Sequence, residues 1–143
     1  MITAARLKET LGGPRVLRGA EDLDALADRV RAGLPYAALD AFAERFNIPL
    51  RELTTVLNLP ERTLARRRRE GKLRADESDR LFRVGRVAAL AEEILGETAK
   101  AARWLRRPHR ALGGKTPLEM LDTDLGASQV DTVLHRLEHG VFS

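Results

Sequence analysis

The sequence predicts an all-α protein, in which a helix-turn-helix is followed by a compact C-terminal helical bundle. Two observations support this prediction, and a third indicates which residues form the core. Apolar residues recur every three or four positions, and no stretch shows the alternation that is typical of a strand. Glycines, prolines and one asparagine separate these stretches at positions that suit helix ends. Aromatic residues make up only 4% of the chain, so Leu, Val and Ala must form most of the core.

The chain divides into three expected segments. They are an N-terminal helical segment, a helix-turn-helix region and a C-terminal domain, at residues 1–33, 34–75 and 76–143. The first 20 residues are rich in glycine and arginine, and we expect them to be loosely ordered. The stretch Glu21–Gly33 predicts a helix that ends at its glycine. Its apolar stripe comprises Leu23, Leu26, Ala27 and Val30.

Three helices are predicted in the middle of the chain, and a tight turn separates the last two. "PYAALDAFAERF" places Ala38, Leu39, Phe42 and Phe46 inward. "PLRELTTVLN" follows and buries Leu50, Leu53 and Leu57. Asn58 lies at the turn, where asparagine is the best residue after glycine for a left-handed backbone. Pro60 then suits the start of a helix over Glu61–Glu70 that Gly71 ends. This spacing is typical of a helix-turn-helix, whose second helix enters the major groove of DNA.

The C-terminal part predicts four more helices. The first two are Ser78–Leu95 and Glu97–Arg107, and Pro108 ends the second. A short helix follows in "TPLEMLDT", where Thr116 is a suitable cap and Pro117 a suitable first residue. The last helix, in "GASQVDTVLHRLEHG", has Val130, Val133, Leu134 and Leu137 on one face and ends at Gly140. We expect Trp104, the sole tryptophan, to be a core anchor.

Charge is distributed unevenly along the chain. Glu61–Arg74 contains seven bases and two acids, and Lys100–Lys115 contains six bases and no acid. Thr116–Ser143 contains five acids and one base. The basic middle suits a polyanionic partner, whereas the acidic end suits a different kind of partner.

The predicted helix Glu61–Glu70 contains four adjacent arginines, which are candidates for DNA binding. The alternative is that they form a basic face in contact with solvent only. Arginine matches both guanine edges and phosphates. Leu64 and Arg68 are expected to face the core. The candidates for groove contact are Arg62, Thr63, Arg66 and Arg67, and those for phosphate contact are Arg69, Lys72 and Arg74.

The residues expected in an enzyme site do not come together in this sequence. The chain has no cysteine, which excludes disulfides and thiolate metal sites and is compatible with a reducing cytoplasm. His135 and His139 are four residues apart, but a metal site needs a further ligand. Gly113, Gly114 and Lys115 lack the spacing of a phosphate loop. We therefore predict no catalytic residue, no metal and no cofactor, and expect a cytoplasmic protein without a membrane span.

Most of the chain, roughly Leu34–Ser143, resembles a known family. "LGGKTPLEML" and "EHGV", with Trp104 upstream, resemble the C-terminal domain of Xre/MbcA/ParS antitoxins. "LPERTLARRRREGKLRADESDRLFRVGRVAALAEEILGE" resembles the helix-turn-helix part of the same family. The resemblance implies an antitoxin that binds and silences a RES-domain toxin, which degrades NAD⁺. It also implies repression of its own operon through operator DNA, as a homodimer or a larger assembly with the toxin.

The resemblance further implies that the C-terminal end covers the active-site cleft of the toxin. The residues this would involve here are Glu138, His139, Gly140, Val141, Phe142 and Ser143. Gly140 can turn the chain outward, and the two apolar residues after it are suitable interface anchors. Two alternatives remain open. The tail could instead fold back on its own domain, and the protein could be a stand-alone transcription regulator whose C-terminal domain only dimerises.

Overall fold

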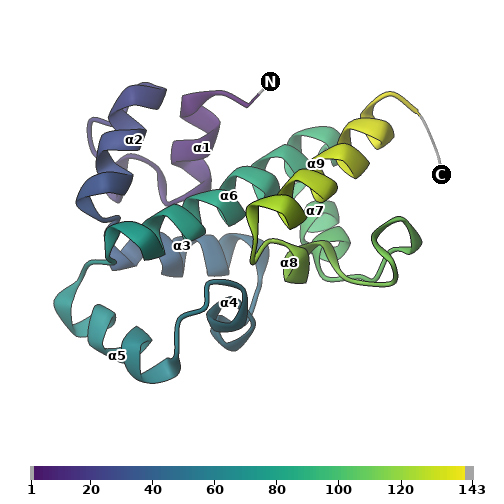
Figure 1. Ribbon diagram of the computed structural model, residues 1–143. Helices are drawn as coiled ribbons and strands as arrows, with labels where there is room; N and C mark the ends of the chain where they lie inside the picture. The colour runs from purple at the N-terminus through teal and green to yellow at the C-terminus, as the bar shows by residue number, and fades with distance from the viewer. Residues whose placement is uncertain (1, 141–143) are drawn as a thin grey trace.

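A computed structural model of the chain describes residues 2–140 and confirms the all-α prediction (Figure 1). Within these residues there is no strand, and only the isolated bridges Pro35–Lys72 and His109–Lys115 show β pairing. The α-helices are α1 Ala4–Thr10, α2 Leu23–Ala32, α3 Tyr36–Phe46, α4 Leu50–Val56, α5 Glu61–Glu70, α6 Ala75–Leu95, α7 Thr98–Leu105, α8 Pro117–Met120 and α9 Asp124–Glu138. Two 3₁₀ turns, η1 Gly13–Arg15 and η2 Arg110–Leu112, complete the described part. None of these helices is long and apolar enough to cross a bilayer.

The long helix α6 forms the centre of the molecule, and the other elements are arranged around it (Figure 1). Five of its apolar residues, Leu81, Val84, Val87, Ala88 and Ala91, are at 0% exposure, whereas Phe82, Ile94 and Leu95 are half-buried. The helix begins at Ala75, three residues before the predicted start at Ser78. The reason is that the Glu77 side chain accepts a hydrogen bond from the Arg74 backbone N–H at 2.9 Å, which stabilises an earlier first turn.

The N-terminal segment is ordered by packing, so the prediction of a loose start was wrong. The hydroxyl of Thr3 accepts a hydrogen bond from the Arg6 N–H and caps α1. Leu7, Leu11 and Leu17 are at most 3% exposed and join the common core. Packing of these leucines in the common core outweighs the glycine and arginine content that suggested disorder.

A buried carboxylate, Glu92 of α6, ties four helices together. It lies 2.6 Å from Arg6 Nη1 of α1 and 2.9 Å from Arg45 Nη2 of α3, and it accepts a hydrogen bond from the hydroxyl of Thr98 in α7 at 2.6 Å. Burial raises the pKa of Glu92, but the hydrogen bonds from Arg45 and Thr98 and the two arginine charges outweigh burial. They hold the pKa below its ordinary value of about 4.5.

The predicted apolar faces of α2 and α3 differ in how far they are buried. In α3, Ala38, Leu39, Phe42 and Phe46 are all buried, as predicted. In α2 only Leu26 of the expected stripe is buried, with Ala27 and Val30 partly buried. Leu23 is 57% exposed, because it is the first residue of the helix and lies beyond the edge of the core.

Threonines cap the last two helices: Thr116 was predicted, and Thr123 lets α9 begin at Asp124, before the expected stretch. Helix α7 is shorter than predicted and ends at Leu105 rather than Arg107. Trp104 is half-buried rather than central, and its ring packs against His109 with 4.9 Å between the ring centroids. Thr116 caps α8 and Thr123 caps α9, each by accepting a hydrogen bond from a backbone N–H of the first turn.

Candidate nucleic-acid and toxin interfaces

Helices α4 and α5 form the predicted helix-turn-helix. Leu53 and Leu57 are buried as predicted and Leu59 is buried as well, whereas Leu50 is only half-buried. Asn58 has φ +51°, so it adopts the left-handed conformation that the sequence predicts. The Leu59 N–H donates to the Thr54 carbonyl at 2.9 Å, which closes the turn. Helix α5 then runs from Glu61 to Glu70 and ends at Gly71, where φ is +78°.

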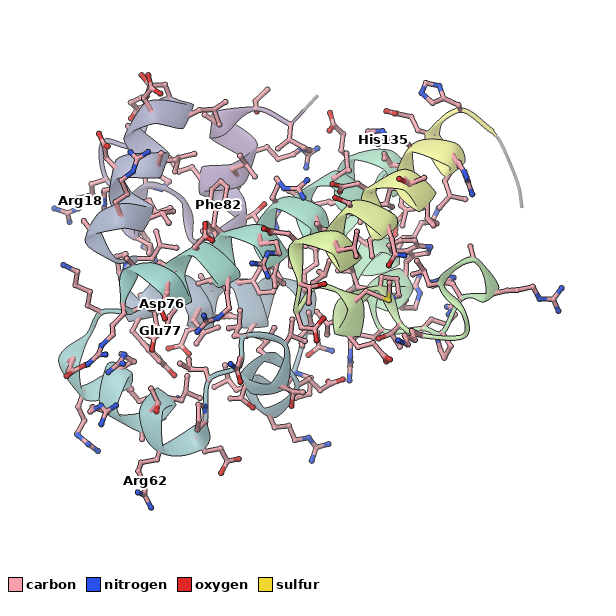
Figure 2. The ribbon with its side chains drawn as sticks, in the orientation of Figure 1. Arg18, Arg62, Asp76, Glu77, Phe82 and His135 are labelled. Carbon is pink, nitrogen blue, oxygen red and sulfur yellow. The ribbon has the colours of Figure 1, made fainter. Side chains whose placement is uncertain are left out.

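Helix α6 holds the helix-turn-helix through two polar contacts. The Arg80 Nε donates to the Leu57 carbonyl at 2.7 Å and fixes the turn. Arg67 of α5 forms a two-pronged contact with Glu77, with Nε to Oε1 at 2.7 Å and Nη2 to Oε2 at 3.0 Å. Figure 2 shows Glu77 at the start of α6, on the side that faces α5. These contacts set the direction in which α5 presents its outer face.

The burial of Arg67 corrects its assignment to groove contact. Its side chain is 3% exposed and that of Glu77 is 6% exposed, so the guanidinium is not available to DNA. Glu70 adds a further ion pair to Arg67 at 3.2 Å. Burial raises the pKa of Glu77, but the hydrogen bonds from Arg67 and the Arg74 N–H outweigh burial and hold the pKa below its ordinary value.

Arg68, which was predicted to face the core with Leu64, is exposed. Its guanidinium lies 5.5 Å from the centre of the Tyr36 ring, a distance that suits a cation–π contact. The burial of the two arginines is thus the reverse of the prediction: Arg67 is buried and Arg68 is exposed. The spacing alone did not distinguish them, because positions three and four residues after Leu64 both lie near its face.

The other candidates for DNA contact lie on or beside the outer side of α5. Arg62, Arg66 and Arg69 are exposed and fall within about 60° of one another around the helix, at about 100° per residue. Figure 2 shows Arg62 projecting away from the body of the molecule. Lys72 and Arg74 are exposed on the connection to α6, and Thr63 is half-buried. Within residues 2–140 no carboxylate forms an ion pair with Arg62, Arg66 or Arg69.

The C-terminal candidate site is described only in part. Glu138, His139 and Gly140 are exposed at the end of α9, and Gly140 has φ +69°, the left-handed conformation expected for a helix end. Val141, Phe142 and Ser143 lie outside the described residues. Val130 and Leu134 are buried, whereas Val133 and Leu137 are half-buried.

The histidine pair of α9 lies beside the carboxylate of Glu138, which is 3.8 Å from His139 Nε2. His135 Nδ1 lies 3.3 Å from the Glu138 carboxylate, and both side chains are exposed. No group of three His, Cys, Asp or Glu residues in the described part of the chain is arranged to hold a metal ion.

Comparison with known proteins assigns both halves of the chain. Residues 25–86 match the Antitoxin Xre-like helix-turn-helix domain, and residues 90–140 match the Antitoxin Xre/MbcA/ParS C-terminal toxin-binding domain. A protein named Antitoxin Xre from Yersinia enterocolitica is 35% identical over 120 residues, which cover 82% of this chain and 81% of that protein. The chain belongs to the Xre/MbcA/ParS antitoxin family.

Two further relatives show the range of similarity to this antitoxin. Antitoxin Xre from Pseudomonas putida is 42% identical over 108 residues, 71% of this chain and 68% of that protein. A protein named Prs ADP-ribosylating antitoxin, from a Sphingobium species, is 24% identical over 155 residues, 99% of this chain and 97% of that protein. The family match to a toxin-binding domain supports a toxin as partner, and the helix-turn-helix match supports DNA as a second partner.

Proposed function

We propose that this antitoxin binds a RES-domain toxin that degrades NAD⁺, covers the active-site cleft of the toxin with its C-terminal region, and represses its own operon. The observation that carries the proposal is the order of two matched families along one chain, a helix-turn-helix at 25–86 and a toxin-binding domain at 90–140. A stand-alone transcription regulator would not need the toxin-binding domain. Inhibition by occupation of a cleft requires no catalytic group in the antitoxin.

The proposed contact with the toxin uses Glu138, His139 and Gly140, followed by Val141, Phe142 and Ser143. The first three are exposed at the end of α9, and Gly140 has the left-handed conformation that commonly ends a helix. Two apolar residues then provide anchors, a type of side chain that often dominates interface energetics.

The experiment is a titration of NAD⁺ hydrolysis by the toxin with full-length antitoxin and with a chain that ends at Gly140. We expect the full chain to inhibit stoichiometrically and the truncated chain to bind the toxin in gel filtration without blocking hydrolysis. Full inhibition by the truncated chain would refute the role of the tail. The adjacent reading frame of the operon provides the toxin to test, and its failure to encode a RES domain would favour the stand-alone regulator.

The proposed contact with operator DNA uses the outer face of α5. Arg62, Thr63 and Arg66 approach the groove, and Arg69, Lys72 and Arg74 approach phosphates. Replacing Arg62 and Arg66 by Ala should weaken binding to the DNA upstream of the operon and reduce its salt dependence. The charge-matched control replaces Arg15 and Arg18, which are exposed outside the helix-turn-helix (Arg18 in Figure 2). We propose that a homodimer binds the operator, because operators with two half-sites match a two-fold protein.

A further inference from the structure

A second basic segment, Lys100–Lys115, has no part in the function proposed above. It contains six bases and no acid, and it covers most of α7 and the loop that follows. All six basic residues are exposed. They are Lys100, Arg103, Arg106, Arg107, Arg110 and Lys115.

One of these bases attaches the segment to the first helix of the helix-turn-helix. Arg106 Nη2 lies 2.7 Å from Glu52 Oε2 and its Nε lies 3.3 Å from Oε1, so the guanidinium and the carboxylate of α4 pair through two bonds. Arg106 Nη1 also donates to the Asn47 carbonyl at 3.4 Å, just before α4. The end of α7 therefore lies beside α4, although 54 residues separate Arg106 from Glu52.

The junction forms a shallow polar hollow of about 400 Å³. Its lining includes Asn47, Glu52, Arg103, Arg106, Arg107 and Pro108. The carboxylate of Glu52 is already paired with Arg106. Among residues 2–140 no carboxylate forms an ion pair with Arg103 or Arg107. The hollow thus carries two uncompensated guanidinium groups, a combination that favours an anionic ligand.

The position of the hollow indicates which anion it meets. When a helix-turn-helix docks on DNA, its second helix lies in the major groove and its first helix crosses the sugar-phosphate backbone. Here the first helix is α4, and the hollow adjoins it through Glu52. We propose that Arg103 and Arg107 bind phosphodiester groups of duplex DNA beside α4, so that the toxin-binding domain adds to DNA affinity. This inference rests on the proposed binding of operator DNA by α5.

Contacts of this kind position a protein on DNA without reading its sequence. Each phosphate contact contributes about 0.9 to the slope of the logarithm of affinity against the logarithm of salt concentration. Losing two contacts should lower the slope by about 1.8. With the affinities of the variant and the unmodified chain taken as equal at 1 M salt, the variant should bind about 30-fold more weakly at about 0.15 M salt.

The test uses the full chain with Arg103→Gln and Arg107→Gln, and a duplex of the DNA upstream of its own reading frame. Fluorescence anisotropy across a salt series should show the lower slope of log affinity against log salt concentration. The Gln variant should lose affinity by the same factor on a duplex of random sequence. The variant with Arg103→Lys and Arg107→Lys should keep the slope, because it keeps both charges. The variant with Arg15→Gln and Arg18→Gln, which loses the same charge elsewhere, should keep it as well.

Each outcome decides between the two proposals. If the unmodified chain does not bind the duplex, the proposed operator binding fails and this inference fails with it. If the unmodified chain binds and the Arg103→Gln, Arg107→Gln variant has an unchanged slope, only this inference is overturned. An unchanged slope together with weaker inhibition of the toxin would assign the hollow to the toxin instead. Circular dichroism of each variant, compared with the unmodified chain, identifies any loss of fold.

Discussion

Replacing Arg67 by Met tests how the DNA-binding helix is held on the body of the molecule. The structure places this guanidinium between Glu77 and Glu70, with Nε 2.7 Å from Glu77 Oε1 and Nη1 3.2 Å from Glu70 Oε1. Both members of the pair with Glu77 are almost fully buried, at 3% and 6% side-chain exposure. Methionine keeps much of the apolar stem of arginine but leaves the Glu77 carboxylate buried without its cation.

The size of the effect follows from this burial. Removing one partner of a buried ion pair typically costs about 3–5 kcal/mol, because the remaining charge stays desolvated. The Arg74 N–H still donates to Glu77 at 2.9 Å, so we expect the lower end of that range, about 3 kcal/mol. For a chain of this length, 1 kcal/mol changes the melting temperature by roughly 3 °C, which gives a decrease of roughly 10 °C.

Thermal and urea unfolding followed by circular dichroism measure this change. Arg69→Met is the matched control, because Arg69 is exposed on the same helix, and its free energy of unfolding should change by no more than about 0.5 kcal/mol. The double replacement Arg67→Met with Glu77→Leu should recover most of the lost stability, since it removes the stranded charge. If the Arg67→Met variant has the same melting temperature and free energy of unfolding as the Arg69→Met variant, the buried pair does not hold α5 and the reasoning is wrong.

Three further predictions concern the turn between α4 and α5, the close approach of α9 to the Met120 backbone and the pH dependence of stability. Asn58 has φ +51°, so Asn58→Ala should cost about 1 kcal/mol in unfolding free energy and Asn58→Gly much less, as urea denaturation will measure. Gly126→Ala would put a Cβ 1.9 Å from the Met120 carbonyl oxygen, and the displaced backbone should cost roughly 1–3 kcal/mol in the same assay. The pKa of Glu92 is held below its ordinary value in the folded chain, so the stability it contributes is present above about pH 4.5 and is lost as the pH falls through the lowered pKa. Glu92→Gln should therefore be much less stable than the unmodified chain at pH 7 and approach it in strongly acidic buffer, and a constant difference would contradict this account.

Local sequence signals predicted most of the fold. The spacing of leucines, the asparagine at the turn and the glycine after Glu70 all act within a few residues, and they locate α4 and α5 closely. The threonine before Pro117 likewise locates α8. The same signals did not predict order in the N-terminal segment, because Leu7, Leu11 and Leu17 are ordered by packing against residues far away in the sequence.

The candidate site was predicted less completely for the same physical reason. Four adjacent arginines occupy four directions around a helix, and the sequence alone does not show which one meets a buried acid. Glu77 lies ten residues after Arg67, in the next helix, and this contact decides the burial of Arg67. Arg103 and Arg107 were visible as charge in the sequence, but only the contact between Arg106 and Glu52 places them beside α4.

Helix α6 runs between the side of the molecule that carries α5 and the side that carries the end of α9 (Figure 1). Its 21 residues span about 31 Å, with Glu77 near one end and Glu92 near the other. The first end holds α5 through Arg67, whereas the far end is tied to α1, α3 and α7 through Glu92. Figure 1 shows α5 and the end of α9 on opposite sides of the molecule. A toxin held at the end of α9 therefore need not cover α5, which makes simultaneous binding of toxin and operator geometrically compatible with this fold.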